Sequence, residues 1–297
     1  MTGGTVYVAG HTRVRATRAE MSDRYDALYR IVAESQPTGV RFTYYRAVSK
    51  GLIPKTDLGY VKVQRALAAM REAGRLPYEW IVDSSRWMRK SRTYDGVEDV
   101  LYDVAASYRR SLWTDSGVAV EVWCESESVA GVLVGVTDPW DVPLFPIKGQ
   151  TSIAFAHSAA QTYRHDPREL VVYYVGDRDP AGLEIETNLR EKLSRYSGGR
   201  QFSFERLACT AEQVEQWHLL GTRPKKTSYR DAVTGAKEQW RGEAYEVEAI
   251  DPPILRDIVE EAITRWIDPE ALRLHRIAEA DERAFLEQLA GTYGGQP

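Results

Sequence analysis

The spacing of apolar residues changes character near residue 117. Before this point, apolar side chains recur at intervals of three and four, as at Tyr25, Leu28, Ile31 and Val32, which is typical of helices with one buried face. A short apolar run between Leu76 and Val82 has the composition of a strand. Helices are predicted over residues 22–36, 39–50, 56–74 and 96–113.

After residue 117, short apolar runs alternate with helix-like stretches. This alternation is typical of a parallel sheet covered by helices, so we expect an α/β domain. Strands are predicted near 118–124, 142–146, 170–175 and 202–208. Helices are predicted near 127–136, 151–163, 182–195 and 211–219, with two amphipathic acidic helices over 252–266 and 269–289. Residues 222–241 are basic, polar and irregular, and are expected to form a surface loop.

The three helices expected before residue 75 resemble a helix-turn-helix, and the run at 76–82 would form the strand of a wing. In such a module a later helix enters the major groove of DNA while basic residues hold phosphates. The alternative is a three-helix bundle with no role in DNA binding, whose solvent-exposed basic residues would give the same pattern. The basic residues that lie off the apolar stripe of the third helix, or in the basic segment 83–95, are Lys62, Arg65, Arg71, Arg86, Arg89 and Lys90.

The composition indicates a globular chain, with 28% charged and 43% hydrophobic residues. No apolar run reaches the length of about 18 residues needed to span a membrane, and the first residues lack a signal-peptide pattern. The two cysteines, Cys124 and Cys209, each lie in an apolar run, which favours buried thiols in a reducing compartment and a cytoplasmic protein.

The charges are distributed unevenly between the two halves. Residues 1–117 carry 19 Lys and Arg against 13 Asp and Glu, whereas residues 118–297 carry 20 against 30. A basic half beside an acidic half is what a DNA-gripping module joined to a cation-dependent catalytic module would need. An asymmetry of this size is also common between unrelated domains.

Carboxylates follow two of the predicted strands directly. Glu125 ends the first strand, and Asp177 and Asp179 end the third. Because ligands bind at the carboxyl ends of parallel strands, these side chains should converge on one crevice, where they would suit Mg²⁺. The alternative is that the Asp-x-Asp-Pro run forms a turn and caps the next helix. Glu127 and Glu121 are the nearest substitute ligands.

The order of these residues resembles a known family. A strand ending in Glu125, followed by a strand ending in Asp177-Arg178-Asp179-Pro180 with Gly182 behind it, is similar to the Toprim domain of topoisomerases and primases. The upstream run from Arg41 to Tyr45, Arg-Phe-Thr-Tyr-Tyr, resembles a motif of the topoisomerase VI A subunit and its meiotic double-strand-break relatives. Together the motifs cover about residues 25–210, and the chain most resembles compact A-subunit-like (Mini-A type) proteins of phages and mobile elements. Family members often have Lys after the Glu, where this chain has Ser126.

The patterns divide the chain into a mobile arm over 1–21, a domain over 22–95, a connecting helix over 96–117, and a domain with a carboxyl-terminal helical extension over 118–297. The resemblance implies that the first domain is a DNA-binding winged helix and the second a Toprim domain. It also implies that the Toprim domain is a Rossmann-like parallel sheet.

The resemblance further implies Mg²⁺-dependent cleavage of double-stranded DNA by a homodimer. Tyr45 would attack the phosphodiester, and Arg41, one turn earlier on the same helix face, would stabilise the phosphate. Tyr45 of one subunit would act with Glu125, Asp177 and Asp179 of the other. No ATP-binding motif is present in the sequence, so ATP-driven strand passage would need a separate ATPase subunit. Two alternatives stay open: a metal-dependent nuclease in which water attacks, and a non-catalytic DNA-binding or assembly protein.

Overall fold

A computed structural model describes residues 18–82, 90–147, 152–163, 166–231 and 234–293. Three helices, α1 (Arg18–Ser35), α2 (Val40–Ser49) and α3 (Asp57–Glu72), pack together and are called the helical unit here, with the segment that follows them to residue 82. Their buried side chains form one apolar core that includes Leu28, Ile31, Val63, Leu67 and Met70. The three predicted helices are confirmed, and α1 extends back into residues 18–21 of the predicted mobile arm.

The predicted wing strand over residues 76–82 is wrong. The segment forms a single 3-10 turn, η1 (Tyr78–Trp80), and its only pairing among the described residues is one bridge between Ile81 and Thr38. The Arg71 side chain donates hydrogen bonds to the carbonyls of Tyr78 (2.6 Å) and Ile81 (3.3 Å). These bonds hold the segment against α3, so it does not form the edge of a sheet.

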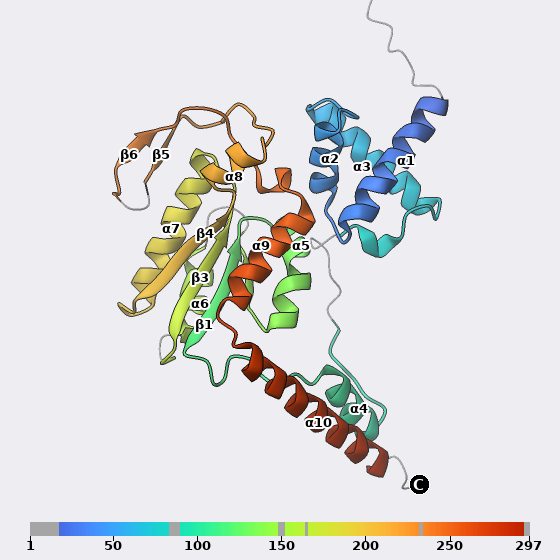
Figure 1. Cartoon of the computed structure of the whole chain (residues 1–297), viewed down its shortest axis with the longest axis vertical. Helices are drawn as coiled ribbons and strands as arrows, with labels where there is room; N and C mark the ends of the chain where they lie inside the picture. The colour runs from blue at the N-terminus through green and yellow to red at the C-terminus, as the bar shows by residue number, and fades with distance from the viewer. Residues whose placement is uncertain (1–17, 83–89, 148–151, 164–165, 232–233, 294–297) are drawn as a thin grey trace, which may run out of the picture.

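The second half contains a four-stranded parallel sheet, which confirms the α/β prediction. Its strands are β1 (Val118–Cys124), β2 (Leu144–Pro146), β3 (Glu169–Val175) and β4 (Phe202–Ala208), in the spatial order β2-β1-β3-β4. Figure 1 shows β1, β3 and β4 with their arrowheads at the same end. The two central strands, β1 and β3, are almost entirely buried, as expected for strands covered on both faces.

Helices cover both faces of this sheet. One face packs against α5 (Glu127–Thr137) and α9 (Pro252–Thr264), through alternate residues such as Val120, Val122 and Val171. The other packs against α6 (Ile153–Tyr163) and α7 (Pro180–Tyr196), through the intervening residues such as Trp123 and Val172. The strand period of two thus produces a three-layer α/β sandwich. Cys124 and Cys209 are buried free thiols, as predicted.

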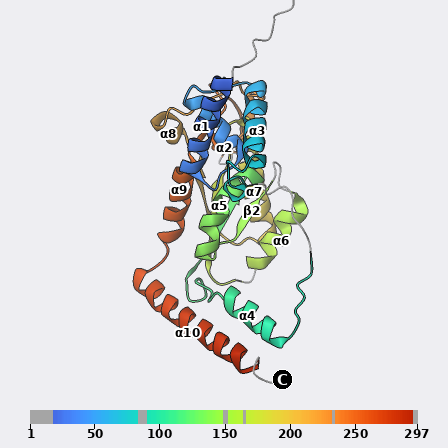
Figure 2. The same cartoon turned by 90° about the vertical axis from the view of Figure 1, so that its right-hand side faces the viewer.

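Two parts lie outside this sandwich. Helix α4 (Val97–Ser107) packs along α10 (Pro269–Tyr293), and the Tyr108 hydroxyl donates to Glu282 (2.6 Å). This pair of helices projects from the end of the sheet opposite the helical unit (Figures 1 and 2).

The region 222–241, predicted as an irregular loop, instead contains an antiparallel ribbon of β5 (Ser228–Arg230) and β6 (Lys237–Gln239). The short helix α8 (Ala211–Gln216) precedes it, and the 3-10 turn η3 (Val247–Ala249) follows it.

The helical unit is tied to the α/β sandwich by hydrogen bonds and ion pairs. Arg256 on α9 donates to the carbonyls of Ser35 and Pro37 (3.2 and 3.0 Å), and Arg46 pairs with Asp251 at 2.7 Å. The Lys55 amine donates to two carbonyls just after α8, at 2.6 and 2.8 Å. These contacts place α2 against the carboxyl edge of the sheet. Among the described helices, none is long and apolar enough to cross a membrane.

Candidate active site at the carboxyl edge of the sheet

Glu125 and Asp177 lie side by side at the carboxyl ends of two neighbouring strands. Cys124, the last residue of β1, pairs in register with Val175, the last residue of β3. The Glu125 amide donates to the Val175 carbonyl (3.1 Å), and the Asp177 amide donates to a carboxylate oxygen of Glu125 (3.0 Å). Because β2 follows β1 on one side and β4 follows β3 on the other, this is the point where the strand order reverses, where open α/β sheets bind ligands.

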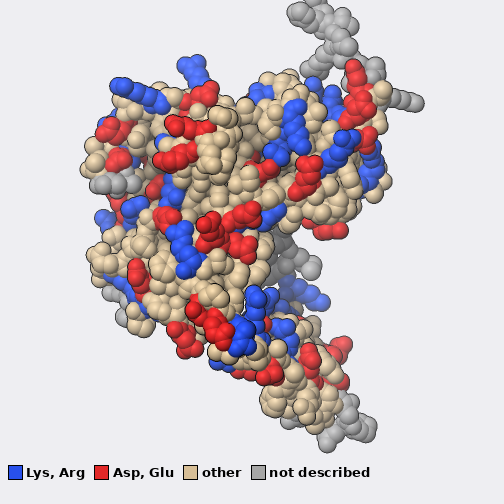
Figure 3. Space-filling view, in the orientation of Figure 1, with Lys and Arg blue, Asp and Glu red and all other residues tan. Residues whose placement is uncertain are grey.

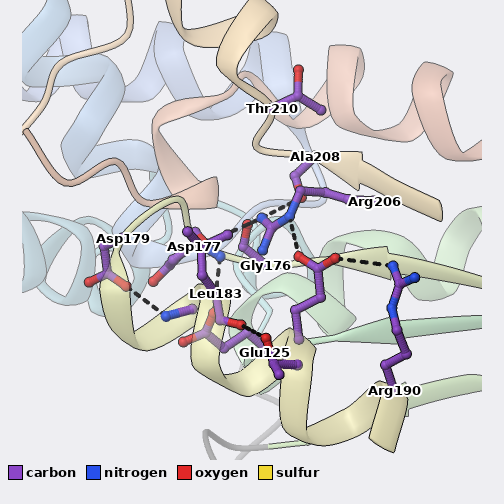
Figure 4. Close-up of polar contacts among 12 residues, drawn as sticks. Glu125, Gly176, Asp177, Asp179, Leu183, Arg190, Arg206, Ala208 and Thr210 are labelled. Atoms are coloured by element: carbon purple, nitrogen blue, oxygen red, sulfur yellow. Dashed lines mark hydrogen bonds and ion pairs between the residues drawn. The ribbon is translucent and has the colours of Figure 1, made fainter. Parts of the chain in front are cut away.

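Asp179 lies two residues further on and has a structural contact of its own. Its carboxylate accepts a hydrogen bond from the Gly182 amide (2.7 Å) and caps α7. The predicted alternative, in which the Asp-x-Asp-Pro run caps the next helix, is therefore confirmed for Asp179. Figure 4 shows the Asp179 side chain directed at the start of that helix. A side chain at Gly182 would place its Cβ 2.2 Å from the Asp177 carbonyl oxygen, so only glycine allows the turn to close this tightly.

Arg206 on β4 binds the backbone of the Gly176–Asp177 turn. It donates to the carbonyls of Gly176 (2.6 Å) and Asp177 (3.2 Å), and its other side is paired with Glu186 on α7 at 2.7 Å (Figure 4). One of its terminal nitrogens and the Tyr174 hydroxyl are buried without a hydrogen-bond partner among the described residues. No pattern in the sequence indicates this arginine, because its role depends on the order of the strands.

Two further carboxylates, Glu246 and Glu248, reach the same edge from the segment at η3. The Val247 amide between them donates to the Asp177 carboxylate (2.8 Å), and the Tyr245 and Arg178 backbones pair in an isolated antiparallel bridge. Glu248 is only 5% exposed. The Glu-x-Glu spacing was visible in the sequence, but nothing in an irregular segment indicates that it returns to the sheet edge.

The carboxyl groups at this edge are crowded and buried. Burial, followed by the charges of Glu125 and Glu248, raises the pKa of Asp177 well above its usual range. The pKa values of Glu125 and Glu248 are also raised, chiefly by burial. Such a cluster repels itself when ionised, and positive charge placed among these groups would relieve the repulsion.

Arg41 and Tyr45 on α2 both face this acidic segment. The Arg41 guanidinium forms an ion pair with Glu246 and lies 3.6 Å from a Glu248 oxygen. The Tyr45 hydroxyl lies near Glu246, which contributes to the raised pKa of Tyr45, while the Tyr44 hydroxyl donates to the Thr56 carbonyl (3.2 Å). Only Tyr45 of the tyrosine pair is therefore directed at the carboxylates, as the helical spacing of about 100° per residue requires.

Glu246 is the charged partner that joins these two side chains. Burial would raise its pKa, but the hydrogen bond and charge of Arg41 outweigh this and lower it. Burial, and then the charge of Glu246, raise the pKa of Tyr45 far above its usual value near 10. In this arrangement Tyr45 is protonated and 6% exposed.

A cavity of about 350 Å³ opens between α2 and the sheet edge, and Arg41, Glu125, Asp177 and Glu248 line it. Within the described part of the chain, no three carboxylate, imidazole or thiol groups are arranged so that all three could bind one metal ion. Mg²⁺ needs less than that, since it is usually held by one or two carboxylates and keeps its waters and a phosphate. The neighbouring carboxylates of Glu125 and Asp177, with raised pKa values, fit such an ion.

The residues predicted to bind DNA have different surroundings. Lys62 and Arg65 are exposed on α3, and Lys90 is exposed beyond the helical unit. Arg71 is occupied by the carbonyls of the 76–82 segment and stacks over the Tyr78 ring at 4.8 Å. Arg86 and Arg89 lie outside the described residues. Ser126 caps α5 by accepting from the Val129 amide (3.1 Å).

Comparison with models of known protein families gives no match, and a search of curated proteins finds no match either. Any function assigned to this chain therefore depends on the arrangement of its own residues and on the motifs of its sequence.

Proposed function

We propose that this protein is a DNA-cleaving transesterase similar to the topoisomerase VI A subunit and acts as a homodimer. One observation carries the proposal: Arg41 from the first motif and Glu125 and Asp177 from the second line a single cavity, although the motifs lie far apart in the sequence. A packing role for either motif alone would not require the two to meet.

The reaction assigned to this site exchanges one phosphodiester for another. The Tyr45 oxygen forms a bond to phosphorus, the bond from phosphorus to the 3′ oxygen breaks, and the protein becomes attached to the new DNA 5′ end. Once the helical unit has separated from Glu246, the Tyr45 proton passes to solvent, and the departing 3′ oxygen takes up a proton from solvent. Arg41 then pairs with the phosphate in place of Glu246.

Glu125 and Asp177 are the residues that would hold Mg²⁺, with Asp179 and Glu248 beside them. The ion would neutralise charge on the scissile phosphate and on the leaving oxygen. We add Glu248 to the predicted metal ligands, because its side chain is buried and close enough to Asp177 to raise the pKa of that residue.

The structure described here corresponds, under this proposal, to a closed resting state. Tyr45 is 6% exposed and Arg41 is engaged by two carboxylates of its own chain. For Tyr45 to act with the carboxylates of the partner subunit, the helical unit must separate from Glu246. DNA can promote this step, because its phosphates compete with Glu246 for Arg41. In the same proposal the helical unit is a helix-turn-helix module that grips duplex DNA through α3.

The burial of Tyr45 also favours a second candidate, a Mg²⁺-dependent nuclease in which water attacks the phosphate and Tyr45 only anchors α2. A third is a DNA-binding protein without catalysis. A duplex-cleavage assay with Mg²⁺ separates the three, using wild type, Tyr45→Phe and Asp177→Asn, with Tyr44→Phe as the matched control. Loss of cutting in the first two variants but not in Tyr44→Phe supports the transesterase. Cutting that persists in Tyr45→Phe identifies the nuclease, and binding without cutting in wild type leaves the non-catalytic protein.

A further inference from the structure

The most basic stretch of the second half lies in and around the β5–β6 ribbon. Residues 222–241 contain six Lys and Arg and two Asp and Glu, in a half of the chain whose totals are 20 and 30. Figure 3 shows Lys and Arg side chains protruding at the top left, over the place where Figure 1 labels β5 and β6. This concentration is opposite in sign to its surroundings, so it is not a consequence of overall composition.

The base of the ribbon is joined directly to the candidate active site. Thr222 and Ala244 close it with two backbone hydrogen bonds of 2.8 and 2.7 Å. The next residue, Tyr245, pairs with Arg178, which stands between Asp177 and Asp179. The ribbon therefore leaves the sheet edge at the same turn that positions the carboxylates.

Contacts with α7 fix the direction of the ribbon. Lys226 pairs with Glu184 at 2.6 Å, Arg230 pairs with Glu191, and the Thr187 hydroxyl donates to the Arg230 carbonyl (3.0 Å). Two of the six basic residues thus serve to attach the ribbon.

The other four basic residues project into solvent. They are Arg223, Lys225, Lys237 and Arg241, all exposed, and none has an ion-pair partner among the described residues. A ring pair supports the ribbon between them, with Tyr229 and Trp240 edge to face at 5.9 Å and the Arg178 guanidinium 5.8 Å from the Trp240 ring. Unpaired cations held on a rigid frame lose little entropy on meeting an anion, which is the condition for a phosphate-binding surface.

We infer that the β5–β6 ribbon is a second DNA-binding element, which contacts the phosphates of the duplex that extends from the carboxylate cavity on the side away from α3. This inference rests on the proposed function. The chain from Lys237 to Tyr245 can span at most about 27 Å, so the contacted phosphates lie within about eight base pairs of the cavity at 3.4 Å per step. A duplex held at both ends of the site in this way would be fixed in register with the carboxylates.

The test is the salt dependence of duplex binding without Mg²⁺. In the triple variant Lys225→Ala, Lys237→Ala, Arg241→Ala, we expect the slope of log affinity against log salt to become shallower by about two to three. The matched control replaces Arg195, Arg273 and Arg276, three exposed residues remote from the sheet edge, and should keep the wild-type slope. Hydroxyl-radical footprinting should show protection lost on one flank only.

The outcomes separate this inference from the proposed function. A triple variant with the wild-type slope and the wild-type footprint overturns the ribbon as a DNA contact, while DNA binding and cleavage by wild type leave the proposed function standing. Wild-type protein that binds no duplex at all overturns both. A slope that falls equally in the control variant also contradicts the inference, because it would reflect net charge rather than this surface.

Discussion

Tyr45 on α2 lies near the carboxylate of Glu246, which comes from the segment at η3, and each group shifts the pKa of the other. A hydrogen bond between such groups, a hydroxyl donor and a charged acceptor, contributes about 1.5–3 kcal/mol, more than one between neutral groups. We therefore expect a double-mutant cycle of Tyr45→Phe and Glu246→Gln, measured by urea unfolding, to give a coupling energy of about 1.5 kcal/mol.

The neighbouring tyrosine provides the control for this cycle. Tyr44 donates to the Thr56 carbonyl, so Tyr44→Phe and Glu246→Gln should be additive within about 0.5 kcal/mol. Equal coupling in both cycles would show that Glu246 acts on α2 as a whole and that its proximity to Tyr45 has no particular weight.

The exposed cations of α3 should carry part of the DNA affinity. Replacing Lys62 and Arg65 with alanine should make the salt slope of duplex binding shallower by up to about two. Arg71→Ala should instead lower stability, by about 1.5–3 kcal/mol, because it leaves the Tyr78 and Ile81 carbonyls without their donor, and should keep the slope. An unchanged slope in the Lys62 and Arg65 variant would mean that α3 does not grip DNA.

The crowded carboxylates predict opposite effects of one substitution on stability and on metal affinity. Asp177→Asn keeps an oxygen to accept from the Val247 amide and removes one charge from the cluster, so the protein should melt at a higher temperature when no divalent ion is present. Its Mg²⁺ affinity, measured by calorimetric titration, should fall at least about tenfold.

Asp179→Asn is the companion variant for this measurement. Asparagine caps helices about as well as aspartate, so α7 and the fold should be retained and only an effect on the ion should appear. Unchanged Mg²⁺ affinity in the Asp177→Asn, Asp179→Asn double variant would exclude this edge as the metal site.

Much of the fold was predictable because its strongest signal is local. The strand predicted over 118–124 matches β1, and the one predicted over 170–175 is one residue shorter than β3. Strands buried on both faces appear in a sequence as uninterrupted apolar runs with abrupt ends. Since parallel strands share a carboxyl edge, the proximity of Glu125 and Asp177 followed from the same pattern.

The rest of the site depends on contacts that no local pattern encodes. Glu246 and Glu248 meet Arg41 only because an irregular segment returns to the sheet edge. The β5–β6 ribbon has three residues in each strand, too few for a period of two to be recognised. The sequence pattern predicts that Arg256 faces solvent on an acidic helix. In the structure it donates hydrogen bonds to carbonyls of the α1–α2 connection.

A buried carboxyl group away from the site gives a stability that depends on pH. Glu121 is 5% exposed and accepts from the Trp123 indole (3.0 Å), and burial raises its pKa from 4.5 to about 7. Between about pH 4.5 and about pH 7, the Glu121 carboxyl group is therefore protonated in the folded state but ionised in the unfolded state. The free energy of unfolding falls as pH rises through this range.

Glu121→Gln should remove that dependence while keeping an acceptor for the Trp123 indole. At pH 8 the variant should be more stable than wild type by up to about 3 kcal/mol, and at pH 4 the two should be similar. Urea unfolding followed by tryptophan fluorescence at several pH values measures the difference. A constant difference between variant and wild type at all pH values would show that Glu121 is ionised in the folded protein.

The most direct measurement of the proposed chemistry is a search for protein covalently attached to DNA. Wild-type protein is incubated with end-labelled duplex and Mg²⁺, stopped with denaturant, and run on a denaturing gel before and after protease treatment. The account predicts a labelled protein–DNA species that is linked through a DNA 5′ end, absent in Tyr45→Phe and Asp177→Asn, and present in Tyr44→Phe. Cut DNA with free 5′ ends and no attached protein, or an adduct that persists in Tyr45→Phe, would contradict it.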